Sequence, residues 1–210
     1  MLGITPQNVQ VFNQNLRYES PEEIIAFALE LSSKTVLTTS FGKHSEVLIH
    51  AASTVAPAIT VLWVDTGLNT QQTYAHAQHL EHKYNLNLRV ASPEKTTAYL
   101  QHRYGNPHVN NPNHDTLSQI LKLDPLKKVF KTLKPEVWFT NIRKEQTNFR
   151  EGLDILSFSP EGILKVSPFF YYSNAQIVAY ARQHMLNIDL EYYDPIKALD
   201  KRECGIHFSN

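Results

Sequence analysis

The sequence predicts an α/β fold, with a mostly parallel sheet flanked by helices on both faces. Short β-branched apolar runs alternate along the chain with segments that begin with helix-capping residues, a pattern typical of parallel strands joined by helices. The chain has 210 residues, 42% of them hydrophobic, which is enough for one domain with a buried core.

Helix starts are the clearest signals in the first half of the chain. Ser20 is a capping residue, Pro21 occupies the first helical position, and two acidic residues follow at the positive end of the helix dipole. Thr70 is a second cap. The elements expected here are helices over residues 21–33, 45–52 and 71–84, and strands over 35–39, 59–64 and 87–90.

The second half continues the alternation and adds a hairpin. Pro93 and Pro125 each begin an expected helix, and residues 103–114, rich in Asn, His and Pro, are expected to form a loop. Residues 159–162 read Ser-Pro-Glu-Gly and separate two short apolar runs, which predicts a hairpin. The elements expected are helices over 92–102, 124–133 and 174–185, and strands over 137–140, 155–158 and 163–166.

Ligands of parallel α/β sheets bind beyond the carboxyl ends of the strands. The loops that follow three of the expected strands are therefore the candidate site, namely residues 40–44, 65–67 and 141–150.

Composition argues against several classes of protein. The 20 basic and 20 acidic residues balance, so no general basic field favours a nucleic acid partner. No apolar run reaches membrane-spanning length, and no basic region followed by a hydrophobic stretch marks a signal peptide. A single cysteine without a signal peptide predicts a cytoplasmic location.

Ser40, Phe41 and Gly42 lie in a polar strand–loop–helix junction that continues through Lys43 and His44. Its hydroxyl groups, its glycine and the N-terminus of the following helix suit phosphate binding. An ordinary polar loop with a helix cap would explain the same residues.

Asp65, Thr66 and Gly67 end the second strand. The carboxylate and the hydroxyl suit hydrogen bonds to a ribose or a base, and the glycine permits close approach. A simple turn is the alternative interpretation.

Arg143 and Arg150 follow the strand at 137–140 and lie two helical turns apart. Arginines at such a place suit bidentate contacts with phosphate or sulfate. The alternative is a solvated helix face.

Cys204 is the only cysteine, preceded by Lys201 and Arg202 and followed by His207. Cationic neighbours favour the thiolate, which is the reactive form. The alternatives are a buried or incidental cysteine and, for His207, an ordinary histidine of the C-terminal tail.

His76, His79 and His82 recur every three residues on one expected helix. This spacing drifts round the helix, and no acidic or cysteine partner has zinc-like spacing nearby. No metal site is therefore expected.

Together these segments resemble the sulfonucleotide reductases, and most closely the phosphoadenylyl-sulfate (PAPS) reductases among them. Ser40-Phe41-Gly42 resembles the modified PP-loop of that family, and Asp65-Thr66-Gly67 resembles its Asp-Thr-Gly segment. The run from Arg143 through Gln146 to Arg150 resembles its Arg-Arg-x-Gln-Ser-x-x-Arg segment, and residues 201–207 are close to its Lys-Arg-Glu-Cys-Gly-Leu-His signature.

The resemblance implies an adenine nucleotide alpha hydrolase-like (PP-loop) fold with a mobile C-terminal tail. Residues 1–195 would form the sulfonucleotide-binding domain, and residues 196–210 would form the tail with the catalytic Cys204. The substrate contacts that the motifs imply are Ser40, Phe41, Gly42, Asp65, Thr66, Gly67, Arg143, Gln146, Arg150, Lys201, Arg202 and His207.

The resemblance also implies the chemistry, that of an oxidoreductase in sulfate assimilation and cysteine biosynthesis. The cysteine would attack the sulfur of PAPS to form an S-sulfocysteine, and thioredoxin or glutaredoxin would release sulfite. No bound cofactor is expected, and one cysteine cannot ligate the iron–sulfur cluster of some relatives. The family suggests a homodimer.

The chain departs from the family in three places that leave other functions open. Residues 70–73 differ from the usual Phe-Pro-Glu-Thr, and Tyr171-Tyr172 stands where the family usually has Asp-Trp. Only residues 196–200 separate Pro195 from the cysteine motif, where relatives carry a longer segment. One alternative is a non-catalytic nucleotide-binding homologue. Another is a PP-loop protein that transfers adenylyl groups from ATP.

Overall fold

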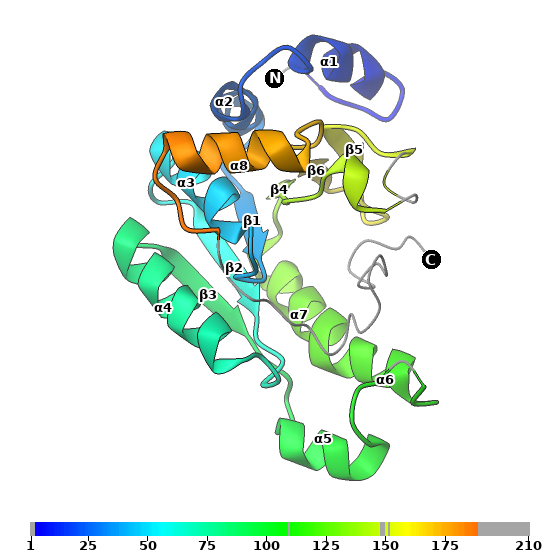
Figure 1. Cartoon of the computed structure of the whole chain (residues 1–210). Helices are drawn as coiled ribbons and strands as arrows, with labels where there is room; N and C mark the ends of the chain where they lie inside the picture. The colour runs from blue at the N-terminus through cyan, green and yellow to red at the C-terminus, as the bar shows by residue number, and fades with distance from the viewer. Residues whose placement is uncertain (1–2, 109, 148–149, 151, 189–210) are drawn as a thin grey trace.

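A twisted six-stranded sheet runs through the computed structural model, which describes residues 3–108, 110–147, 150 and 152–188 (Figure 1). The strand order is β3-β2-β1-β4-β6-β5, and every neighbouring pair is parallel except β5 with β6. The predicted α/β class and the hairpin are confirmed. The strands are β1 (Thr35–Thr39), β2 (Thr60–Val64), β3 (Asn87–Ala91), β4 (Val137–Phe139), β5 (Leu156–Phe158) and β6 (Leu164–Val166).

Helices cover both faces of the sheet, and Figure 1 shows α4 and α7 on opposite sides of it. The side chains of Leu37 and Val61 face one core, and those of the adjacent Val36 and Leu62 face the other, as the two-residue period of a strand requires. The larger helices are α2 (Pro21–Leu31), α3 (Ser45–Val55), α4 (Gln71–Tyr84), α7 (Asp124–Leu133) and α8 (Asn174–Gln183).

Capping residues predicted from the sequence begin three of these helices. The Ser20 hydroxyl accepts a hydrogen bond from the Glu23 backbone at 3.3 Å, and Glu23 accepts one from the Ser20 backbone at 2.7 Å. Ser173 and Gln176 form the same reciprocal pair at the start of α8, and at the start of α4 the Thr70 hydroxyl accepts from the Thr73 backbone.

The start of α5 (Thr97–Tyr104) differs from the prediction, which placed it at residue 92. Thr96 is the cap, because its hydroxyl accepts from the Tyr99 backbone at 3.3 Å. Glu94 instead pairs with Lys128 of α7 at 2.9 Å.

The helix predicted over residues 124–133 is confirmed as α7, with Pro125 in its first turn, but a helical segment that was not predicted leads into it. The helix begins as α6 (His114–Ser118), widens to a π-helix over Gln119–Leu123 and continues as α7. The Asp124 backbone N–H donates to the carbonyl of Gln119, five residues earlier, which is π-helical bonding. A π turn accommodates a proline that an α-helix would exclude, because proline lacks the N–H and its ring clashes with the preceding turn.

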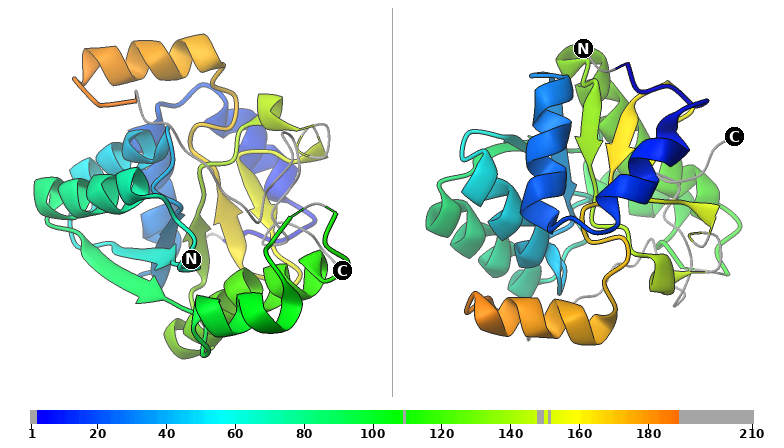
Figure 2. Two further views of the ribbon diagram at one scale, coloured as in Figure 1. Left: turned by 60° about the horizontal axis from the view of Figure 1, so that its bottom comes forward. Right: turned by 90° about the horizontal axis from the view of Figure 1, so that it is seen from above.

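A short helix, α1 (Val9–Leu16), precedes the predicted elements and lies beside β5 (Figure 2). The Asn13 side chain donates to the Leu156 carbonyl at 3.0 Å and accepts from the Leu156 backbone N–H at 2.8 Å. The helix thus satisfies backbone groups of the edge strand that would otherwise face solvent.

The chain order reverses between β1 and β4, which pair with each other although several elements separate them in sequence. β2 pairs with the other side of β1. Loops leaving β1 and β4 therefore diverge, and the crevice between them is where such folds bind ligands.

Candidate functional site

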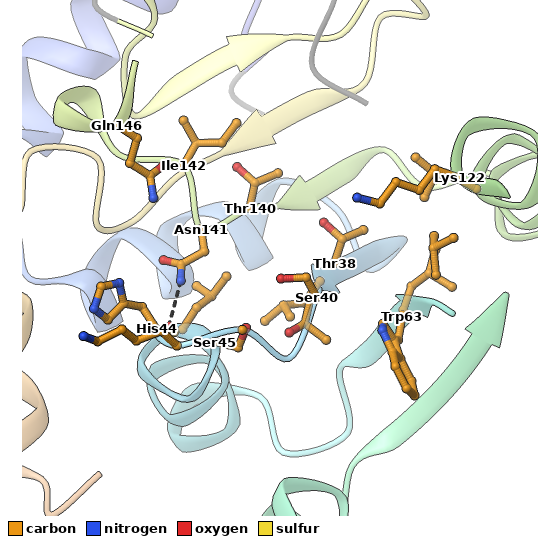
Figure 3. Close-up of a pocket in the computed structure, with 18 of the residues that line it drawn as sticks. Thr38, Ser40, His44, Ser45, Trp63, Lys122, Thr140, Asn141, Ile142 and Gln146 are labelled. Carbon is orange, nitrogen blue, oxygen red and sulfur yellow. Dashed lines mark hydrogen bonds between the residues drawn. The ribbon is translucent and has the colours of Figure 1, made fainter. Parts of the chain in front are cut away.

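A cavity of about 310 Å³ opens at the carboxyl ends of β1, β2 and β4 (Figure 3). Three of its lining residues are cationic, namely Lys43, Lys122 and Arg150. Among the described residues, no aspartate or glutamate lines it. The cavity is therefore suited to an anion.

The loop after β1 contributes much of the lining. Ser40 and Gly42 border the cavity, followed by Lys43, His44 and Ser45 at the start of α3. The Ser45 backbone N–H is bonded to the carbonyl of Gly42 at 2.9 Å, which tightens the turn into the helix. The positive end of the α3 dipole thus lies at the cavity wall.

Phe41 anchors this loop rather than lining the cavity. Its ring is fully buried and packs edge-on against Trp63, with ring centroids 5.2 Å apart. Its backbone has φ +49°, a left-handed conformation that is uncommon for a large side chain. The predicted substrate contact of Phe41 stays a prediction, and its backbone N–H donates to the Thr39 hydroxyl at 3.0 Å.

Asp65 and Gly67 shape the turn after β2, whereas Thr66 lines the cavity. Gly67 has φ +71°, and a Cβ there would lie 2.3 Å from the Thr97 hydroxyl oxygen, so glycine is required. Thr97 donates that hydroxyl to the Thr66 carbonyl at 2.8 Å.

Arg143 and Arg150 are buried and do not lie on one solvated helix face. Lys144–Gln146 forms a single 3₁₀ turn, and Thr147 after it is extended. Gln146 and Arg150 line the cavity, and the Arg150 guanidinium donates to the Gln146 side-chain oxygen. The spacing of two helical turns inferred from the sequence is thus wrong, because the segment leaves helical geometry at Thr147.

Arg143 lies behind the lining residues. Its guanidinium donates to the side chain of Asn174 at 2.8 Å and contacts Nδ1 of His44 at 3.4 Å, and its backbone N–H donates to Gln146 at 3.0 Å. Its buried Nε has no partner among the described residues. Burial lowers the pKa of Arg143 from its ordinary value, but an arginine remains charged.

His44 is neutral in this environment. Burial, Arg143 and Lys43 lower its pKa to about 4. Because Arg143 can only donate, Nδ1 of His44 accepts, which leaves the proton on Nε2.

Several lining residues were not expected from the sequence: Trp63, Asn69, Lys122 and Thr140. Figure 3 shows Lys122 and Trp63 on the side of the cavity opposite Gln146 and His44. Lys122 comes from the π-helix, which no sequence signal announced. Asn141 donates its amide to the His44 carbonyl at 2.8 Å and so joins the loops after β1 and β4.

The sequence analysis also singled out three histidines and the cysteine motif. His76 is buried, whereas His79 and His82 are exposed, and no three metal-ligating side chains gather among the described residues. Cys204, Lys201, Arg202 and His207 lie outside the described residues. None of the described helices is long and apolar enough to cross a membrane.

Comparisons with known proteins agree on one family. Residues 34–193 match the family model described as the phosphoadenosine phosphosulfate reductase domain. The phosphoadenosine 5'-phosphosulfate reductase of Proteus mirabilis is 33% identical over 190 residues, which cover 89% of this chain and 78% of that protein.

Solved structures share the fold. The phosphoadenylyl-sulfate reductase of Candida auris superposes with a TM-score of 0.76 at 21% identity, covering 88% of this chain and 89% of the other. The FMN adenylyltransferase of Candida glabrata has a TM-score of 0.59 at 10% identity, covering 86% of this chain and 59% of the other. The predicted PP-loop architecture is confirmed.

Proposed function

The chain belongs to the phosphoadenosine phosphosulfate reductase family, and from that premise we propose that it reduces PAPS to sulfite and adenosine 3',5'-bisphosphate. This reaction belongs to assimilatory sulfate reduction, which supplies sulfite for cysteine synthesis.

The observation that carries the proposal is the cation-lined cavity beside β1 and β4, where the strand order of the sheet reverses. Arg150, Lys43 and Lys122 line it, and the N-terminus of α3 adds positive potential. A sulfonucleotide carries several negative charges, so this charge arrangement complements it.

Ser40, Gly42, Thr66, Gln146 and Arg150 are the proposed direct contacts to the sulfonucleotide, because they line the cavity. Arg143, Asp65 and Gly67 would act from behind them. Phe41 would hold the loop in place through its buried ring.

Cys204 is the proposed nucleophile. Its thiolate would attack the sulfur of PAPS and form a sulfur–sulfur bond. The bond from that sulfur to the phosphate oxygen would break, and its electron pair would leave with adenosine 3',5'-bisphosphate. Lys201, Arg202 and His207 would offset the repulsion between the thiolate and the sulfonate. We propose residues 1–195 as the binding domain and residues 196–210 as the reactive tail.

Thioredoxin or glutaredoxin is the proposed electron donor. One donor thiol would attack Cys204 and release sulfite, and the second would resolve the mixed disulfide, so the donor leaves oxidised. The single cysteine provides no set of thiolates for an iron–sulfur cluster. We also propose that the protein is a cytoplasmic homodimer and that it binds neither nucleic acid nor membrane.

The first experiment mixes the reduced protein with PAPS, and separately with adenylyl sulfate, in the absence of a donor thiol. We expect intact-protein mass spectrometry to detect one added SO₃ group with PAPS, on Cys204. Cys204→Ser should form no adduct and, with thioredoxin, no sulfite.

Other outcomes would select the alternatives. Nucleotide binding without any adduct would indicate a non-catalytic homologue. Pyrophosphate release from ATP would indicate an adenylyl-transferring enzyme. A stronger adduct with adenylyl sulfate would change the substrate.

A further inference from the structure

The cavity has two chemically different sides. One side carries Gln146, the Arg150 guanidinium that donates to it, and the start of α3. The other carries Leu62, Trp63 and Val64 of β2, together with Lys122. If the proposed function holds, Arg150 and the start of α3 suit the sulfated end of the nucleotide, and the apolar wall of β2 suits its nucleoside.

Asp65 directly follows β2, and its carboxylate is already engaged. One of its carboxylate oxygens, Oδ1, accepts three hydrogen bonds: from the Gly67 backbone at 2.9 Å, from Nδ2 of Asn69 at 2.8 Å and from the Tyr74 hydroxyl at 2.9 Å. Burial and Asp65 raise the pKa of Tyr74 to about 12, so the hydroxyl stays protonated and donates. Asp65 itself does not line the cavity.

Asn69 does line the cavity, and Asp65 fixes which way its amide points. An ionised carboxylate only accepts, so the group of Asn69 that meets it is the NH₂. The amide oxygen Oδ1 therefore remains free of any partner among the described residues. Asn69 presents an acceptor whose orientation is set before a ligand arrives.

We infer that Asn69 is a specificity-determining residue that accepts a hydrogen bond from a neutral donor on the nucleoside, and that Asp65 is its positioning residue. The donor is either the amino group of the base or a ribose hydroxyl, since both present an uncharged N–H or O–H. A base with a carbonyl at that edge would face the Asn69 oxygen acceptor to acceptor and be rejected.

The test uses calorimetry to measure the affinity of the wild-type and variant proteins for three ligands. These are adenosine 3',5'-bisphosphate, its inosine counterpart and its 2'-deoxy counterpart. We expect Asn69→Leu, which keeps the volume and removes the amide, to weaken binding of the adenosine ligand about tenfold. One of the two analogues lacks the group that donates to Asn69. The same substitution should change the affinity for that analogue less than twofold. The matched control is Gln72→Ala, an exposed position in the first turn of α4 outside the cavity.

The role of Asp65 is tested by two variants of different severity. Asp65→Ala releases the amide and should weaken adenosine binding as Asn69→Leu does, with no further loss in the double variant. Asp65→Asn keeps an oxygen acceptor toward the turn and should restore at least half of the lost binding free energy. A purely structural role would lower the melting temperature in proportion to affinity for all three ligands.

Equal weakening of all three ligands by Asn69→Leu, or no weakening, would overturn the inference while leaving the proposed function intact. Failure of the wild-type protein to bind adenosine 3',5'-bisphosphate would overturn the proposed function and the inference with it.

Discussion

Arg143 and Glu46 are both buried charged side chains, 4% and 0% exposed, and their surroundings differ in a way that separates function from structure. In the described part of the chain, no carboxylate lies within ion-pairing distance of Arg143, and its hydrogen-bond partners are the neutral Asn174 and His44. Glu46 instead accepts from Lys83 at 2.7 Å, the Tyr84 hydroxyl at 2.9 Å and the Asn187 backbone at 2.9 Å.

The pKa values of the two side chains are both lowered, but for different reasons. Burial lowers the pKa of Arg143. Burial acts to raise the pKa of Glu46, but the hydrogen bonds from Lys83, the Asn187 backbone and Tyr84 outweigh it, so its pKa lies below the ordinary value. A buried charge with a full set of partners stabilises a fold, whereas one held by neutral groups beside a cavity is available to an anionic ligand.

Removal of the Arg143 charge should have the largest consequence for ligand binding. Arg143→Met should weaken binding of adenosine 3',5'-bisphosphate about 100-fold, because a buried cation beside the anion site is lost. The melting temperature should stay equal or rise, since an underpaired buried charge is replaced by an apolar chain. Calorimetry and thermal unfolding measure the two effects.

Arg17→Met is the matched control for that variant. Arg17 pairs with Asp154 at 2.8 Å near α1, and neither residue lines the cavity. Its loss should leave affinity within twofold. A fall in stability without a change in affinity for Arg143→Met would show that Arg143 is structural.

Substitution of Glu46 should lower stability and leave nucleotide affinity almost unchanged, which is the reverse of the result expected for Arg143. Glu46→Gln should lower the free energy of unfolding by about 2 kcal/mol, because it removes a charge that accepts three hydrogen bonds. Nucleotide affinity of the folded protein should change less than twofold. Urea unfolding with parallel calorimetry tests this, and an affinity loss at unchanged stability would contradict it.

The smallest effect concerns His44 and pH. The pKa of His44 is about 4 in the fold and 6.5 ordinarily, so between these values the unfolded chain binds the proton and the folded chain does not. The stability that His44 contributes is therefore present above pH 6.5 and is lost as the pH falls toward 4.

His44→Gln should flatten the dependence of melting temperature on pH across that window. The pKa values of His50 and His76 are also lowered by burial, so both proteins keep a residual slope, and the difference between their curves isolates His44. Identical curves would show that the pKa of His44 is the same in the folded and unfolded chains, which would contradict the lowered value.

Local signals predicted most of the fold. The caps at Ser20, Thr70 and Ser173 marked three helices, and the apolar runs marked all six strands to within two residues. These signals depend on the backbone and its nearest neighbours, which the sequence contains directly. The start of α5, the helix before Pro125 and α1 were missed, because a rival cap, a π turn and pairing with an edge strand decided them.

The α/β class, the loops that form the site and the motifs that identify the family could all be predicted from local signals. The role of each charged or polar side chain could not, because it depends on contacts made in the folded chain. Asp65 was expected to contact a ligand but is engaged by its own turn, whereas Asn69 and Lys122, unmarked in sequence, line the cavity. The physical reason is that hydrogen-bond partners and burial are set by residues distant in the chain, and those contacts exist only once the sheet has assembled.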